Sequence, residues 1–176
     1  TNEIVAVQAG DAFYNAAPSI TNVLVVTQKV LTVTNLVVSN KVYDATDVAS
    51  FGGAALAGVV GGDDVSLANA TAGTFAQATT GTAISVTHTM SLSGPRAVHY
   101  RLVPPTGLAA NITARPVTAT NAVAQNKVYD GTTAAAITGA ELAGAVPGDD
   151  VLLANAATGT FAQASAGTNL AVTTYM

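Results

Sequence analysis

An internal repeat of 86 residues constrains this 176-residue chain more than any other feature of its sequence. When the chain is shifted by 86 positions, residues 41–90 align with residues 127–176 without a gap, and 31 of the 50 aligned residues are identical. The same shift places residues 1–29 over residues 87–115 with a weaker likeness. Self-similarity at a fixed spacing predicts that the chain is built from successive copies of one structural unit.

The phase of the repeat divides the chain into three parts. Residues 1–29 correspond to the C-terminal strands of a preceding repeat, residues 30–115 make one complete repeat, and residues 116–176 make the N-terminal two-thirds of a following one. We therefore expect a segment of a longer tandem array. The inter-module joints are expected where one unit ends and the next begins, at Thr27, Lys29 and Val30 and again at Thr113, Arg115 and Pro116.

The hydrophobic pattern within each unit has a period of two residues. Ile84 and Val86 alternate with Ser85 and Thr87, and similar alternation recurs along the repeat between turn signals rich in Gly, Asp and Pro. Half-polar alternation of this kind predicts an all-β fold of antiparallel sheets, each with one face in water. Seven or so strands in 86 residues favour a two-sheet sandwich.

Tyrosine supplies the largest side chains that we expect to find buried. The likeliest large rings in the core are Tyr43 and Tyr129, which occupy the same position in successive repeats. A buried tyrosine hydroxyl needs a hydrogen-bond partner. The neighbouring carboxylate of Asp44 or Asp130, or a turn carbonyl, could supply it.

The sequence Asn-Lys-Val-Tyr-Asp-Gly-Thr-Thr at 126–133, followed by Gly-Asp-Asp-Val at 148–151, resembles the YDG repeat of bacterial adhesins. The resemblance implies tandem immunoglobulin-like antiparallel β-sandwich repeats of 86 residues, related to the mostly bacterial Ig-like (MBG-type) domains. Such modules occur in large exported proteins similar to filamentous haemagglutinin. The first copy departs from the pattern, because Ala45 replaces the glycine found at position 131. A positive φ is costly for alanine, so we expect no left-handed residue there.

Composition and motifs argue against several classes of function. There is no cysteine for a disulfide framework or a thiolate metal site, and six lysines and arginines are too few for a nucleic-acid interface. No apolar run approaches the roughly 18 residues of a membrane span. The sequence contains no nucleophile elbow, P-loop or dinucleotide fingerprint, and the resembled family brings no catalytic residues, so an enzyme is not expected.

Paired aspartates are the only candidates for a metal site. They stand at repeat-related turns, as Asp63 and Asp64 in one copy and as Asp149 and Asp150 in the next. Calcium favours clustered carboxylates at loop tips, but two adjacent carboxylates fall short of its six to eight oxygens. The competing interpretation, which we favour, is a turn in which aspartate accepts backbone N–H bonds. Hence we expect no cofactor, with calcium as the weaker alternative.

The surface composition points to assembly. Only 9% of the residues are charged, whereas roughly 25–35% is usual on the surface of an independent soluble domain. We therefore expect a stalk or filament segment of a secreted or bacterial cell-surface adhesin, in contact with neighbouring copies of the same repeat. Two alternatives are open for the partial repeats: strands donated between molecules complete them, or they are parts of one longer tandem array. The alternative is an adhesive module that binds glycan or a surface protein directly. Neither hypothesis involves nucleic acid or a membrane span.

Overall fold

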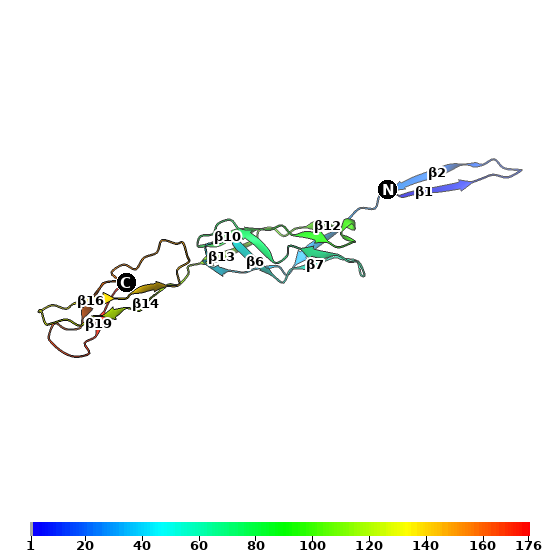
Figure 1. Cartoon of the computed structure of the whole chain (residues 1–176). Helices are drawn as coiled ribbons and strands as arrows, with labels where there is room; N and C mark the ends of the chain where they lie inside the picture. The colour runs from blue at the N-terminus through cyan, green and yellow to red at the C-terminus, as the bar shows by residue number, and fades with distance from the viewer. Residues whose placement is uncertain (1) are drawn as a thin grey trace. The chain divides into compact units, whose positions relative to one another are not determined.

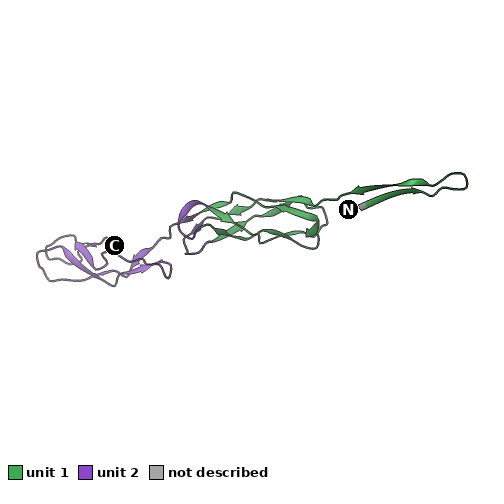
Figure 2. Ribbon diagram, turned by 90° about the horizontal axis from the view of Figure 1, so that it is seen from above, with its two compact units in different colours: residues 1–39, 48–76, 85–110 green, residues 40–47, 77–84, 111–176 purple. Residues whose placement is uncertain are grey.

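The computed structural model describes residues 2–176 and divides into two compact units. One unit comprises residues 1–39, 48–76 and 85–110, and the other comprises residues 40–47, 77–84 and 111–176 (Figure 2). Two of the boundaries between the units fall within strands, one in β10 (Gly81–Thr87) and one in β13 (Ala109–Thr113). Among the described residues, no helix is long and apolar enough to cross a membrane.

The first strands form an antiparallel hairpin of β1 (Asn2–Gln8) and β2 (Ala17–Leu24) (Figure 1). Its turn is held by Asp11, whose Oδ1 accepts hydrogen bonds from the N–H groups of Phe13 and Tyr14 at 2.8 and 2.9 Å. Every residue of β2 is exposed. Apolar side chains on both strands therefore lie in solvent.

A three-stranded sheet is centred on β3 (Lys29–Thr34). This strand pairs in antiparallel fashion with β7 (Ala55–Ala57) and in parallel with β12 (Tyr100–Val103). A second small sheet joins β8 (Ser66–Ala68) to β11 (Ser91–Ser93), and the 3-10 helix η1 (Ala97–His99) precedes β12. Leu31 lies in the middle of β3 and is fully buried.

A six-stranded sheet has the order β4-β6-β9-β10-β13-β5. Alternate residues of its longer strands are buried, as the predicted period of two requires: Ala49 and Phe51, Ile84 and Val86, Ala110 and Ile112. The strands not yet given bounds are β4 (Val37–Val38), β5 (Lys41–Val42), β6 (Val48–Gly52) and β9 (Ala72–Phe75).

The predicted all-β fold is confirmed, but the expectation of purely antiparallel sheets is wrong. Strand β12 runs parallel to β3, with Leu102 opposite Leu31, and β13 runs parallel to β5, with Ile112 opposite Lys41. Alternating polarity determines which face of a strand is buried and carries no information on strand direction. Both parallel partners are separated by about 70 residues of chain, so no hairpin turn fixes their direction either.

Residues 116–176 form six further strands, each 86 positions after a strand in the preceding repeat. Their registers coincide: Thr118 pairs with Ala143 as Thr32 pairs with Ala57. The strands are β14 (Thr118–Thr120), β15 (Val123–Ala124), β16 (Ala134–Thr138), β17 (Glu141–Ala143), β18 (Thr158–Phe161) and β19 (Val172–Thr173).

Ala45 adopts the left-handed conformation, with φ of 62°, so the expectation from its side chain is wrong. The equivalent Gly131 has φ of 73°, which means that the turn geometry is kept and alanine bears the strain. We expect Ala45→Gly to raise the free energy of unfolding by about 0.5–1 kcal/mol. Glycine relieves the strain of the left-handed backbone, and this gain is partly offset because glycine also increases the conformational entropy of the unfolded chain. Chemical denaturation measures the change.

The matched control is Gly131→Ala, which should lower the stability by a similar amount because it introduces the strain at the equivalent position. A loss of stability in Ala45→Gly would show that the turn at residues 44–46 is not under backbone strain.

Candidate functional site

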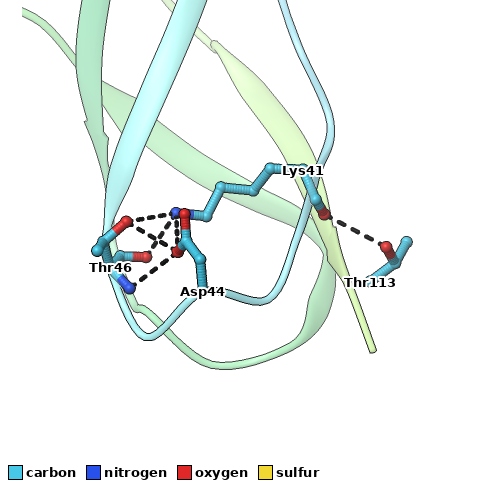
Figure 3. A network of polar contacts seen from close by, with 4 residues as sticks. All are labelled: Lys41, Asp44, Thr46 and Thr113. Carbon is cyan, nitrogen blue, oxygen red and sulfur yellow. Dashed lines mark hydrogen bonds and ion pairs between the residues drawn. The ribbon is translucent and has the colours of Figure 1, made fainter. Parts of the chain in front are cut away.

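The Lys-Val-Tyr-Asp loop of the first copy is built around the ammonium group of Lys41 (Figure 3). Its Nζ lies 2.7 Å from Asp44 Oδ1 and donates to the carbonyl and hydroxyl oxygens of Thr46 at 2.7 and 2.8 Å. The same Asp44 oxygen accepts hydrogen bonds from the Thr46 N–H and hydroxyl at 2.9 and 2.8 Å. Thr113 attaches this loop to β13, because its hydroxyl donates to the Lys41 carbonyl at 3.3 Å.

The second copy repeats this geometry. Lys127 Nζ lies 2.8 Å from Asp130 Oδ1 and donates to the carbonyl and hydroxyl oxygens of Thr132. The Thr132 N–H donates to Asp130 at 2.9 Å, and the lysine also lies 5.6 Å from the ring centre of Phe161. The invariant spacing Lys-x-x-Asp-x-Thr therefore encodes a closed turn in which every charged group is paired.

These contacts perturb both carboxyl groups. The hydrogen bond from Lys41, followed by those from Thr46, lowers the pKa of Asp44 from 3.8 to about 2. Lys127 and Thr132 lower the pKa of Asp130 to about 2 in the same way. In both copies the aspartate accepts a hydrogen bond from the backbone N–H two residues further along the chain, which is an Asx turn.

A pH dependence follows from these values. Because the folded pKa of each aspartate lies below its unfolded value, the stabilisation is complete above about pH 4 and is lost as the pH falls towards 2. We expect the double variant Asp44→Asn/Asp130→Asn to be less stable than the wild type at pH 7 and equally stable near pH 2. Urea unfolding at a series of pH values measures this gap.

A second double variant, Lys41→Met/Lys127→Met, removes the main cause of the pKa shifts and should lose stability over the same pH range. A stability gap that stays constant down to pH 2 would contradict the role assigned to the lysines.

Two tyrosine hydroxyls bind the first aspartate of the Gly-Asp-Asp turns. Tyr100 is buried, donates to Asp63 Oδ2 at 2.5 Å and accepts from the Val60 N–H at 3.1 Å. These two residues were not predicted as partners, although Tyr100 recurs at position 14 and Asp63 at position 149. The hydrogen bond to Asp63 is the main cause that raises the pKa of Tyr100 above 10.0.

Tyr43 occupies a different position of the repeat from Tyr100 and binds the corresponding aspartate of the next repeat. Its hydroxyl donates to Asp149 Oδ1 at 3.1 Å, which raises its pKa above 10.0. Neither of the expected partners, the adjacent Asp44 or a turn carbonyl, receives this bond, and Asp44 is instead paired with Lys41. The prediction that Tyr129 is buried is wrong: the side chain is 67% exposed. The Tyr43 hydroxyl therefore finds its hydrogen-bond partner in the following repeat.

At the second repeat boundary, the predicted joint residues lie around the contact between Tyr43 and Asp149. Arg115 Nε donates to the Gly144 carbonyl at 2.6 Å, and the chain then turns into Pro116 and β14. Tyr43, Arg115 and Asp149 line a small cavity of about 240 Å³. At the first boundary Lys29 and Val30 open β3, opposite Tyr100 and Arg101, and Thr27 precedes the strand.

The four calcium candidates are not brought together with other ligands in the described part of the chain. Asp63 and Asp149 each accept a tyrosine hydroxyl, and their N–H groups close turns onto Val60 and Val146 at 3.1 Å. Asp64 contributes its carbonyl oxygen to the Arg96 N–H at 3.2 Å, and Asp150 follows Asp149 in the turn. No three His, Cys, Asp or Glu residues among residues 2–176 are grouped to hold a metal ion.

Comparison with known proteins identifies one family. A family model of the YDG domain matches residues 27–107 and 113–176, two segments that start 86 residues apart. No curated protein and no solved structure matches the chain significantly. Since the matched segments cover most of the 176 residues, the chain belongs to the YDG domain family.

Proposed function

We propose that this chain is a structural segment, a stalk or filament subunit, of a bacterial extracellular or cell-surface adhesin or fibre. Its work is mechanical: tandem immunoglobulin-like modules hold a distal adhesive part away from the cell or build a fibre. The chain is not an enzyme in this proposal. Its partners are neighbouring copies of the same repeat.

The observation that carries the proposal is the set of direct bonds at the boundary between two repeats. Tyr43 of one repeat binds Asp149 of the next, and Arg115 binds the Gly144 carbonyl. The first bond uses groups that recur with the repeat, since Tyr43 corresponds to Tyr129 and Asp63 to Asp149, whereas Lys29 stands at the position that corresponds to Arg115. Successive modules that bond to one another in this way transmit load better than modules joined only by a flexible linker.

Force spectroscopy tests the mechanical proposal. When residues 1–176 are pulled from their ends, we expect a force-resisting unfolding step that releases roughly 300 Å of chain for the complete 86-residue repeat, before its folded length is subtracted. Tyr43→Phe should lower the force at which residues 116–176 unfold. The matched control is Tyr129→Phe at the equivalent position, where the ring is 67% exposed and loss of the hydroxyl should change nothing.

Unfolding without measurable resistance would refute a load-bearing role. Antibodies raised against residues 30–115 should label intact cells that make the protein, and labelling only after permeabilisation would refute the proposed location. Reproducible binding of residues 1–176 to a defined set of glycans would favour the direct adhesive module instead.

A further inference from the structure

Two strand pairs of the complete repeat are parallel, and each joins an early strand of the repeat to a late one. Strand β12 lies beside β3 over four residue pairs, from Tyr100 opposite Lys29 to Val103 opposite Thr32. Strand β13 lies beside β5. Strand β3 is the first strand of the repeat and β13 is its last. Both of these strands are therefore bonded to a strand from the opposite end of the repeat's sequence.

The parallel direction decides how the pair of β3 and β12 is loaded when the chain is pulled along its length. The chain enters β3 at Lys29 and leaves β12 after Val103, so the pull acts on the N-terminal end of one strand and on the C-terminal end of the other. In a parallel pair these two ends lie at opposite ends of the ladder. The strands are therefore pulled past each other, and the bonds that join them carry the load together.

An antiparallel pair joined by a hairpin turn is loaded differently. Its two loaded ends are neighbours, so its bonds open one after another from that end. Bonds that must break together resist a pull better than the same bonds opened in sequence. Strand direction is therefore a mechanical property of the repeat.

The second pair, β5 with β13, is shorter and is loaded in the same way. The chain enters β5 at Lys41 and leaves β13 at Thr113. The Thr113 hydroxyl donates to the Lys41 carbonyl at 3.3 Å, and the Thr113 carbonyl accepts from the Tyr43 N–H at 2.9 Å. The Asn111 N–H donates to Asn40 Oδ1 at 2.8 Å. These bonds strengthen a short ladder at the point where the load leaves the repeat.

Buried residues keep water away from both pairs. Leu31 in β3 is 0% exposed, and Ile112 in β13 is 2% exposed. Hydrogen bonds in such surroundings are stronger than hydrogen bonds in contact with water. Tyr100, the first residue of β12, is also buried, and its hydroxyl donates to Asp63 and accepts from the Val60 N–H. The pair of β3 and β12 is thus anchored to the loop that precedes β8.

We propose that the pairs β3 with β12 and β5 with β13 are the load-bearing elements of the repeat, and that both are loaded in shear when the chain is pulled along its length. The inference rests on the proposed mechanical function and specifies which bonds give the resistance. It also predicts that the resistance depends on direction. A pull along the chain meets the combined strength of each pair, whereas a pull that separates neighbouring ends of β3 and β12 does not.

The direction of the pull can be tested with optical tweezers, because the chain has no cysteine and two introduced cysteines define the points of attachment. Lys29→Cys with Val103→Cys attaches the handles at opposite ends of the β3 and β12 pair and loads it in shear. Lys29→Cys with His99→Cys attaches them at neighbouring ends, since Lys29 lies opposite Tyr100. We expect the unfolding force to be several-fold higher in the first geometry than in the second.

Urea denaturation without force is the control for the two double variants. All three substituted residues are exposed, so the two variants should have the same free energy of unfolding. A difference in force then comes from the direction of the pull alone. Equal unfolding forces in the two geometries would overturn the proposal.

Two threonines allow a second test, in which the same bond is removed inside and outside a load-bearing pair. The Thr113 hydroxyl donates to the Lys41 carbonyl at 3.3 Å. The Thr87 hydroxyl donates to the Thr74 carbonyl, also at 3.3 Å, in the antiparallel pair of β9 and β10. Thr113→Val and Thr87→Val should therefore lower the equilibrium stability to a similar extent.

The two valine variants should differ under force. When residues 1–176 are pulled from their ends, only Thr113→Val should lower the force at which residues 30–115 unfold. Forced unfolding is governed by the unfolding rate, and hence by the bonds that break first. Equal unfolding forces in the two variants would overturn the proposal, because the force would then follow overall stability.

These outcomes can be told apart from failure of the proposed function. A chain that resists a pull from its ends, but resists equally in both cysteine geometries, would refute the load-bearing pairs and leave the stalk proposal standing. Direction-dependent resistance in a protein that antibodies detect only after permeabilisation would support the load-bearing pairs and refute the proposed location. Absence of resistance in every geometry would refute both.

Discussion

Replacing Gly73 with alanine is expected to lower the free energy of unfolding by about 3 kcal/mol. A Cβ at this position would overlap the Phe51 ring and lie 2.5 Å from the Thr87 carbonyl oxygen. The ring is buried and the carbonyl belongs to strand β10, so neither can move without disturbing the sheet. For a domain of this size, such a loss lowers the melting temperature by roughly 12–24 °C.

Gly52 provides the control for this substitution. It lies in β6 of the same sheet, has no positive φ, and has no atom within 4 Å of the position where its Cβ would lie. Gly52→Ala should therefore leave the stability unchanged or raise it slightly, because alanine restricts the unfolded chain. Thermal unfolding followed by circular dichroism compares the two. Similar melting temperatures for both variants would show that the Gly73 site can expand.

Leu31→Ala is expected to cost about 3 kcal/mol, within the 2–5 kcal/mol usual for truncating a fully buried leucine. Leu31 is 0% exposed and lies on β3, the central strand of its sheet, between β7 and β12. Truncation leaves a cavity that the surrounding strands can close only in part. Urea denaturation gives the change in the free energy of unfolding.

The equivalent residue in the next repeat supplies the comparison. Val117 is 44% exposed, and among the described residues β14 is paired only with β17. Val117→Ala should cost less than 1 kcal/mol, since little apolar surface is lost. A large effect at Val117 would mean that this position is covered in solution.

The all-β fold and the alternation of buried residues along its strands could be predicted from the sequence, because the determinants of strand position are local. Alternating residues such as Ile84 and Val86 are buried as expected, and the turns at Asp44 and Asp130 follow the repeated Lys-x-x-Asp-x-Thr spacing. The motif at 126–133 likewise predicted membership of the YDG family, and the match to the family model confirms it.

The features that could not be predicted depend on contacts distant in sequence. Tyr43 finds its partner 106 residues away, at Asp149, and nothing near Tyr43 in the sequence marks that residue. Tyr129 shares the motif of Tyr43 but is exposed, because burial depends on what packs against the ring rather than on the ring itself. The parallel pairing of β12 with β3 has the same origin in a long-range contact.

Ala45 shows a different limit of local reasoning. Its side chain disfavours a positive φ, yet the surrounding bonds from Asp44 and Lys41 impose the turn. The paired groups on either side of the residue outweigh a backbone cost of about 1–2 kcal/mol.

The bond between Tyr43 and Asp149 also bears on how such a gene can change over generations. Both copies of the motif in this chain carry the phenol and the carboxylate together, so unequal crossing-over that inserts or deletes such a unit joins a matching pair. The number of units can then change without any accompanying substitution. Populations that carry the gene should differ more readily in the number of units than in the residues that connect them.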